Sequence, residues 1–260
     1  MSPKEIRDAF EPWRQAHARP AWKLLSEPGA TSRSWFGGLP LAVDDDDSWP
    51  ICESCGLPMR LMLQLDLAEL PEDFDAIRRD GVLQVFYCSL DDGSCDTWAP
   101  FSGTHHLRIV EPSDVEANPP SDIEIWPKVP ITGWRRFDDA PDPEEHERLG
   151  IEYTYDFNQD VVHVRSLEPA IELRDVSLDL DPEVEHVISR AARGDKLGGW
   201  PHWIQGPEYP VCPISGEPME LLVQIDSEDH LDYMFGDSGC AHITQSRQHP
   251  EILALGWACS

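Results

Sequence analysis

The feature that most constrains this chain is an internal repeat. Residues 49–66 (WPICESCGLPMRLMLQLD) and residues 209–226 (YPVCPISGEPMELLVQID) share the pattern P-[IV]-C-x-x-[CS]-G-x-P-M-x-L-x-[LV]-Q-[LI]-D without a gap. Upstream, residues 36–40 (FGGLP) are echoed by residues 197–201 (LGGWP) at nearly the same distance from the cysteine. Such collinear agreement indicates a duplicated structural unit. A chain of 260 residues can bury a substantial core, as one large domain or as two fused smaller ones.

Each copy is expected to form a turn, a loop and then a buried strand. Residues 59–66 are short, nearly all apolar and bounded by turn formers, which is typical of a strand covered on both faces. Residues 81–88 alternate and are rich in β-branched and aromatic side chains, so they predict the next strand. The counterpart around residues 239–244 has a weaker pattern. The repeated glutamine and aspartate that end the first strand are expected to satisfy backbone amides of the adjoining turns.

Two helices are predicted outside the repeats. Ser2 as a cap, Pro3 at the first helical position and Glu5 predict a helix that runs to about Ala18. A second helix is predicted over residues 181–194, from an Asp-Pro-Glu start to a glycine stop. The fold class expected is therefore α+β: internally duplicated β-rich units packed together, with peripheral helices and a zinc-stabilised loop in the first unit.

The domain organisation follows from these elements. Residues 1–110 are expected to hold the N-terminal helix and the first repeat unit with its zinc site. Residues 111–180 are rich in acid and proline, which predicts a connecting insertion with a few strands such as residues 161–164. Residues 181–260 are expected to hold a helix and the second repeat unit, all within one compact domain.

Four cysteines of the first copy predict a structural zinc site. Cys52 and Cys55 form one pair and Cys88 and Cys95 a wider one, and four thiolates from two loops close a tetrahedral shell. The turn-forming residues 90–94 can return Cys95 to Cys88. The second copy keeps one cysteine of this set, so the metal is expected in the first copy alone.

Other uses of the cysteines remain open at this point. A redox-active Cys-x-x-Cys pair is disfavoured because no helix start follows to lower a thiol pKa. Substitution of His105 or His106 for one cysteine ligand remains possible. The three remaining cysteines, Cys212, Cys240 and Cys259, are expected to be small buried hydrophobes.

The charge of the chain bears on its partners. Forty-nine acidic against twenty basic residues give a formal charge of −29, which opposes binding to nucleic acid or anionic lipid and favours a basic protein partner. The densest acidic run, Asp44, Asp45, Asp46 and Asp47, is the candidate contact with such a partner, although such runs are most often solvated loops. No basic-then-apolar start and no membrane-length apolar run is present in the sequence, so a cytoplasmic location is expected.

The sequence contains no phosphate-binding glycine loop, nucleophile elbow, zinc-protease helix or kinase signature. We therefore expect no catalytic residues and no enzymatic activity.

Residues 196–205 (KLGGWPHWIQ) and 221–226 (LLVQID), with the repeated P-x-C and P-M-x-L elements, resemble the YwqG-like family of bacterial proteins. The resemblance covers roughly residues 30–110 and 195–257. It implies association with secreted antibacterial toxins and a role as an immunity protein, without catalytic residues to carry over. The leading hypothesis is an immunity protein that binds and occludes a cognate toxin, for example a cationic nuclease. Two alternatives are an enzyme or small-ligand protein using the cleft between the repeat units, with His202 or His105 near it, and a zinc-stabilised interaction adaptor.

Overall fold

The structure is a computed structural model. It describes residues 3–43, 49–75, 77–90, 94–156, 158, 161–164, 171–174 and 190–260. Across these residues the elements are α1 (Pro3–His17), β1 (Arg19–Leu25), β2 (Trp35–Phe36), β3 (Arg60–Asp66), the 3-10 helix η1 (Leu67–Glu69), β4 (Val82–Tyr87), β5 (His105–Val110), β6 (Val129–Pro130), β7 (Gly133–Asp139), the 3-10 helix η2 (Pro143–Glu145), β8 (Tyr153–Asp156), β9 (Val161–Val164), β10 (Ile171–Arg174), β11 (Lys196–Gly198), β12 (Glu220–Asp226), β13 (Cys240–Gln245) and β14 (Leu253–Ala258).

The expected α+β class with peripheral helices is wrong, because the described chain is mostly β-structure with α1 as its one α-helix. The helix that the capping residues predict at the N-terminus is confirmed over Pro3–His17. The second helix was predicted over residues 181–194, of which residues 181–189 lie outside the described part and residues 190–194 are not helical. Further strands extend the repeat units instead. Strand β6 is added to the first sheet, and strands β1 and β7 are added to the second.

The two repeat units form sheets with the same strand order. The five-stranded sheet runs β5-β4-β3-β2-β6, and the six-stranded sheet runs β14-β13-β12-β11-β1-β7. The first four strands of each list correspond one to one, and every pairing is antiparallel. A third sheet, β10-β9-β8, has three strands.

The register of the two sheets also agrees. Phe36 of β2 lies opposite Leu63, and its counterpart Leu197 of β11 lies opposite Val223. The pairing of β3 with β4 shifts register between Leu61 and Leu63, and the pairing of β12 with β13 shifts at the corresponding place. The duplicated sequence therefore forms two equivalent sheets that share the same register shift.

The repeated glutamine links each sheet to the loop that follows the Gly-Gly-x-Pro motif. The Oε1 atom of Gln64 accepts a hydrogen bond from Leu41 N at 2.8 Å, and that of Gln224 accepts one from His202 N at 2.8 Å. Both glutamine side chains are fully buried. Because a buried amide without partners would cost free energy, these bonds fix the loop against the sheet in each unit.

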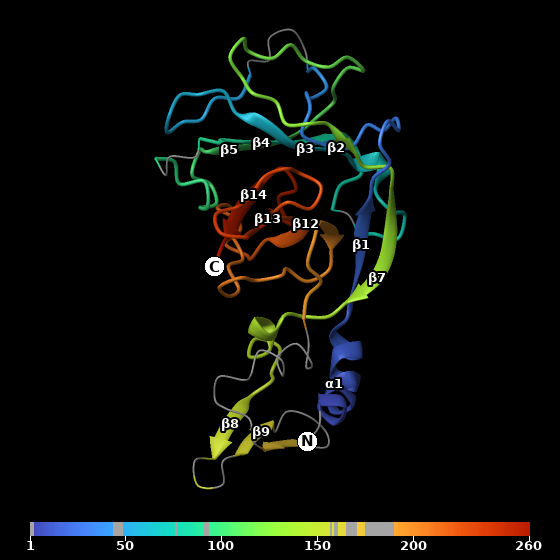
Figure 1. The fold of residues 1–260 in the computed structure, drawn as a ribbon, viewed down its shortest axis with the longest axis vertical. Coiled ribbons are helices and arrows are strands. Elements are labelled where there is room, and N and C mark those ends of the chain that lie inside the picture. The colour runs from blue at the N-terminus through green and yellow to red at the C-terminus, as the bar shows by residue number, and fades with distance from the viewer. Residues whose placement is uncertain are drawn as a thin grey trace.

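Figure 1 shows how the sheets are arranged along the molecule. The five-stranded sheet lies at one end, strands β12, β13 and β14 lie beneath it, and the long strands β1 and β7 run along one side. The helix α1 and strands β8 and β9 lie at the opposite end. Strands β1 and β7 therefore carry the six-stranded sheet from the shared core towards the helical end of the molecule.

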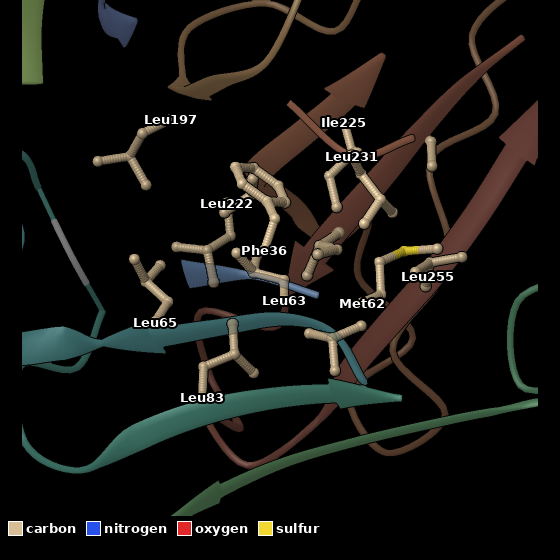
Figure 2. Packing of buried hydrophobic residues seen from close by; sticks show 14 of the residues in the cluster. Phe36, Met62, Leu63, Leu65, Leu83, Leu197, Leu222, Ile225, Leu231 and Leu255 are labelled. Carbon is tan, nitrogen blue, oxygen red and sulfur yellow. The ribbon is translucent and has the colours of Figure 1, made fainter. Parts of the chain in front are cut away.

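The core lies between the two sheets. Figure 2 shows Met62, Leu63 and Leu83 of the first unit facing Leu222 and Leu255 of the second. All five are nearly or fully buried and belong to one apolar cluster. Since β3 and β4 are buried along almost their whole length, each has a second covered face, which the cysteine loops of the first unit occupy.

Candidate metal centre

The first cysteine loop is a tight turn closed by backbone hydrogen bonds. Cys52 N donates to Leu57 O at 2.9 Å, Gly56 N donates to Cys52 O at 2.9 Å, and Met59 N donates to Pro50 O at 2.9 Å. Gly56 has a positive φ of 73°, a conformation that glycine adopts at little cost. The loop therefore presents Cys52 and Cys55 towards the outer face of the five-stranded sheet.

The second pair comes from the connection between β4 and β5. Cys88 directly follows β4, and its N–H donates to Thr104 O at 3.0 Å, just before β5 begins. The chain returns so that the sulfur of Cys95 lies 3.8 Å from the sulfur of Cys88. The structure thus brings all four predicted cysteines together, whereas Asp44, Asp45, Asp46 and Asp47 lie outside the described residues.

The four sulfur atoms form a cluster of metal-binding size. The sulfur of Cys52 lies 3.9 Å from that of Cys95, the sulfur of Cys55 lies 3.7 Å from that of Cys88, and all four lie within 4.8 Å of one another. A tetrahedral shell with Zn–S bonds of about 2.3 Å has sulfur–sulfur edges of about 3.8 Å, and a disulfide bond is only about 2.05 Å long. All four cysteines are free thiols, so the geometry fits a shared ion.

The surroundings of these thiols differ in a way that suits metal binding. Burial raises the pKa of Cys88 and of Cys95 above the ordinary value. Burial acts in the same direction on Cys52, but the backbone N–H groups of Cys55 and Ser54 stabilise its thiolate, and its pKa is lowered overall. A buried group of thiolates is unfavourable without a cation, so a bound metal ion would supply the charge that stabilises them.

His105 and His106 lie beside this cluster but not in it. Among the described residues, the group of possible metal ligands at this place consists of the four cysteines alone. The Nε2 atom of His105 lies 2.6 Å from Thr97 O, and its ring stacks on Tyr87. Burial lowers the pKa of His105 to about 4, so this imidazole is neutral at pH 7 and is held by the protein itself.

The second unit keeps the loop but only one of its two thiols, that of Cys212. Cys212 N donates to Glu217 O at 2.9 Å and Gly216 N donates to Cys212 O at 2.9 Å, as at the corresponding positions of the first unit. Ser215 stands where the first unit has Cys55. Burial acts to raise the pKa of Cys212, but the Ser215 hydroxyl and nearby amides outweigh it and lower the pKa to about 6.

A second group of possible ligands, which the sequence did not suggest, joins the ends of β11 and β12. Asp195, fully buried, lies 2.9 Å from Nδ1 of His230, and Asp229 lies 3.6 Å from the same nitrogen. The Asp195 hydrogen bond raises the pKa of His230. Asp195 also accepts from the backbone N of Asp226 at 2.7 Å, so its hydrogen bonds already tie a turn to the sheet.

The fold and the site together define a duplicated β-sheet protein with a four-cysteine cluster in its first unit. The chain belongs to a family described as a domain of unknown function (DUF1963), which matches residues 34–249. This match includes both copies of the repeated motif and the segment between them, and it ends before β14. No curated protein matches the chain. Among the described residues, no helix is long and apolar enough to cross a membrane.

Proposed function

We propose that this chain is a zinc-stabilised protein-binding domain, and that it acts as an immunity protein by occluding a basic antibacterial toxin. The observation that carries the proposal is a set of half-exposed apolar side chains on the two loops that supply the cysteines. They lie in a chain whose formal charge is −29.

Zinc is the ion that a shell of four thiolates at these distances favours. With four protein ligands the shell has no open position for water or substrate, so the metal is structural. Its part in function is to hold two loops rigidly against the outer face of the sheet. The loops are also joined directly, because Glu53 N donates to Gly103 O at 3.1 Å.

Four large apolar side chains on these loops are half exposed. We call them the knuckle surface: Ile51, Leu57, Trp98 and Phe101, with exposed fractions of 48–57 %. Ile51 and Leu57 flank the first cysteine pair, and Trp98 and Phe101 follow Cys95. Aromatic side chains held on a rigid support are typical anchors of protein interfaces.

The knuckle surface adjoins a pocket that can accept an anchor from a partner. Trp98 is one wall of a cavity of about 270 Å³ whose other walls include Trp203, Tyr209 and Trp257. Trp257 N donates to Trp98 O at 3.2 Å, which ties the zinc loop of the first unit to the sheet of the second. An apolar pocket beside an exposed tryptophan is the arrangement found at the centre of many interfaces.

The charge argues for a basic partner. A charge of −29 would speed the approach of a cationic protein and repel nucleic acid and anionic membranes. The run from Asp44 to Asp47 precedes the first cysteine loop in sequence, and we propose that it contacts this partner. The YwqG-like resemblance of residues 196–205 and 221–226 supports a toxin as the partner and the cytoplasm as the place of action. Occlusion requires no catalytic residue.

The test is co-expression with the protein encoded beside the gene for this chain. We expect that protein to arrest growth when expressed alone, and we expect this chain to restore growth at about one copy per toxin. The double variant Trp98→Ser with Phe101→Ser should lose protection, because it removes both exposed aromatic anchors. The matched control is Met234→Ser, which removes another exposed apolar side chain outside the knuckle surface.

Two results would overturn the proposal. One is a harmless neighbour, or protection that the double variant leaves intact. The other is protection by catalytic amounts of this chain that leaves the toxin altered after separation, which would mean that the chain is an enzyme.

A further inference from the structure

A cavity of about 490 Å³ lies between the two repeat units, within the size range of small-molecule sites. One wall is the start of β1, from Arg19 to Trp22. The first unit contributes Phe74, and the second contributes Gly198 and Leu222. It shares Tyr209 with the pocket beside Trp98, and the function proposed above does not use it.

Two guanidinium groups meet one tryptophan ring at this cavity. The Arg19 guanidinium lies 3.4 Å from the centre of the Trp200 ring, and the Arg148 guanidinium lies 5.8 Å from the same ring. Arg148 also lies over the ring of Tyr209 at 5.0 Å. Stacking on an aromatic face fixes the plane of a guanidinium while its N–H groups stay available at the edge.

The nearby carboxylates already have partners. Glu145 is fully buried and accepts from Arg148 at 2.6 Å and from the hydroxyl of Tyr209 at 2.6 Å. On the same cavity, Arg247 is paired with Glu220 at 2.9 Å and with Asp75 at 3.1 Å.

Arg19 is the exception. Within the described part of the chain its guanidinium stacks on Trp200 and has no hydrogen bond or ion pair. A chain with 49 acidic and 20 basic residues has abundant carboxylates with which to neutralise an arginine. The carboxylates that line the cavity, Asp75 and Glu220, are paired with Arg247 and make no hydrogen bond to Arg19. The stacked Arg19 guanidinium is therefore suited to a carboxylate brought by a ligand.

Part of the cavity lining is apolar. The rings of Trp22 and Phe74 meet edge to face, with centroids 5.3 Å apart and an interplanar angle of 79°. Gly198 lies at the wall with a φ of 63°, and a Cβ there would lie 2.9 Å from the Phe74 ring. The glycine of the repeated Gly-Gly-x-Pro motif thus lets Phe74 approach β11 and complete this wall.

We infer that this cavity binds a small organic anion, with its carboxylate on the Arg19 guanidinium and an aromatic or branched apolar group against Trp22 and Phe74. The two units contribute different walls, so binding would also hold them together. The site requires no reaction, since it binds and releases its ligand unchanged.

The test uses phenylacetate, 3-phenylpropionate and indole-3-acetate as probes, with phenylacetamide as the neutral analogue. Binding to the whole zinc-loaded chain is measured by isothermal titration calorimetry and by ligand-observed NMR. We expect saturable binding of at least one acid with Kd below about 1 mM, and at least about tenfold weaker binding of the amide, because the charge-assisted contact is lost.

Variants locate the site. Arg19→Gln is expected to weaken binding at least about tenfold, and Phe74→Ala is expected to weaken it as well. Arg7→Gln, an exposed arginine of α1, is the matched control and should bind as the parent does. If Arg19→Gln does not fold, Arg19→Lys keeps the charge, loses the planar fork and should bind more weakly than the parent.

The inference is overturned if no acid binds up to 5 mM, a concentration about fivefold above the expected upper limit of Kd. It is also overturned if Arg19→Gln and Arg7→Gln bind alike, or if phenylacetamide binds as well as the acids. None of these outcomes depends on the toxin, so the site and the proposed function fail separately.

Discussion

Cys88 and Ser246 occupy corresponding positions in the two sheets. Each residue directly follows the strand that pairs with the repeated strand, and each donates its backbone N–H, at 3.0 Å, to the residue just before the next strand. With Ser215 in place of the second cysteine, the second unit therefore presents one thiol and two hydroxyls at three of the ligand positions. The backbone of the site was duplicated, while the thiolates that a zinc ion requires remain in one copy.

The first prediction compares these two positions. Cys88→Ser, which gives the first unit the residue of the second, should lower the free energy of unfolding by several kcal/mol, because structural zinc binding is coupled to folding. Ser246→Ala should change it by no more than about 1 kcal/mol, since it removes a neutral hydroxyl. Urea unfolding measures both. Equal effects of the two variants would contradict a metal-dependent first unit.

A second prediction concerns a buried ion pair. The ammonium of Lys196, with no exposed surface, lies 2.7 Å from the carboxylate of Asp139, which also accepts from Trp200 N and Ala192 N. Burial lowers the pKa of Lys196. Removing one partner of a buried pair costs about 3–5 kcal/mol.

Asp139→Asn should cost more stability than Lys196→Met. The carboxylate keeps two backbone donors when the lysine is lost. Asparagine at position 139 leaves the buried ammonium without a counter-charge and places an NH2 group beside backbone N–H donors. Chemical denaturation of the two single variants is the measurement. The reverse order, or losses below about 1 kcal/mol, would be inconsistent with this pair as a buried constraint.

The third prediction concerns pH. His242 is buried, and burial lowers its pKa from the ordinary 6.5 to about 3. In the unfolded chain His242 binds a proton near pH 6.5, whereas in the folded chain it stays neutral until a much lower pH. The free energy of unfolding therefore falls as the pH drops below 6.5. The loss for one such histidine is about 1.4 kcal/mol per pH unit.

His242→Gln isolates this effect, because Gln84 occupies the corresponding position of the first unit and donates to Leu41 O at 2.8 Å. Between pH 6.5 and 4.5 the variant should lose about 2–3 kcal/mol less stability than the parent. His230, whose pKa is raised, has the opposite pH dependence in both proteins and cancels in the comparison. Parallel stability profiles would exclude a neutral buried His242.

The metal cluster and the repeated strands were accessible from sequence because they depend on local spacing. Each cysteine pair lies within one loop, and the apolar run before Gln64 lies within one strand. The strands β3 and β4 start within one residue of the predicted limits. The Ser2 cap with Pro3 at the first helical position predicted α1 for the same reason.

The parts that sequence reasoning missed depend on contacts between distant segments. β1 pairs with β7 and with β11, and no local pattern in residues 19–25 indicates these partners. The stacking of Arg19 on Trp200 and the pairing of Asp139 with Lys196 arise from the same long-range pairing. Expecting helices at the sheet edges was wrong because strands from outside the repeats occupy those edges. The correspondence of Ser246 with Cys88 could have been found by aligning the strand β13 of the second copy with β4 of the first.

The most direct test of the account is the metal content of the purified chain, measured by elemental analysis together with native mass spectrometry. Protein prepared without chelator or oxidation should contain about one zinc ion per chain. Cys212→Ser should keep this ion, whereas Cys52→Ser and Cys88→Ser should lose it. A parent chain without metal, or a Cys88→Ser chain that retains a full equivalent of zinc, would contradict the four-cysteine centre.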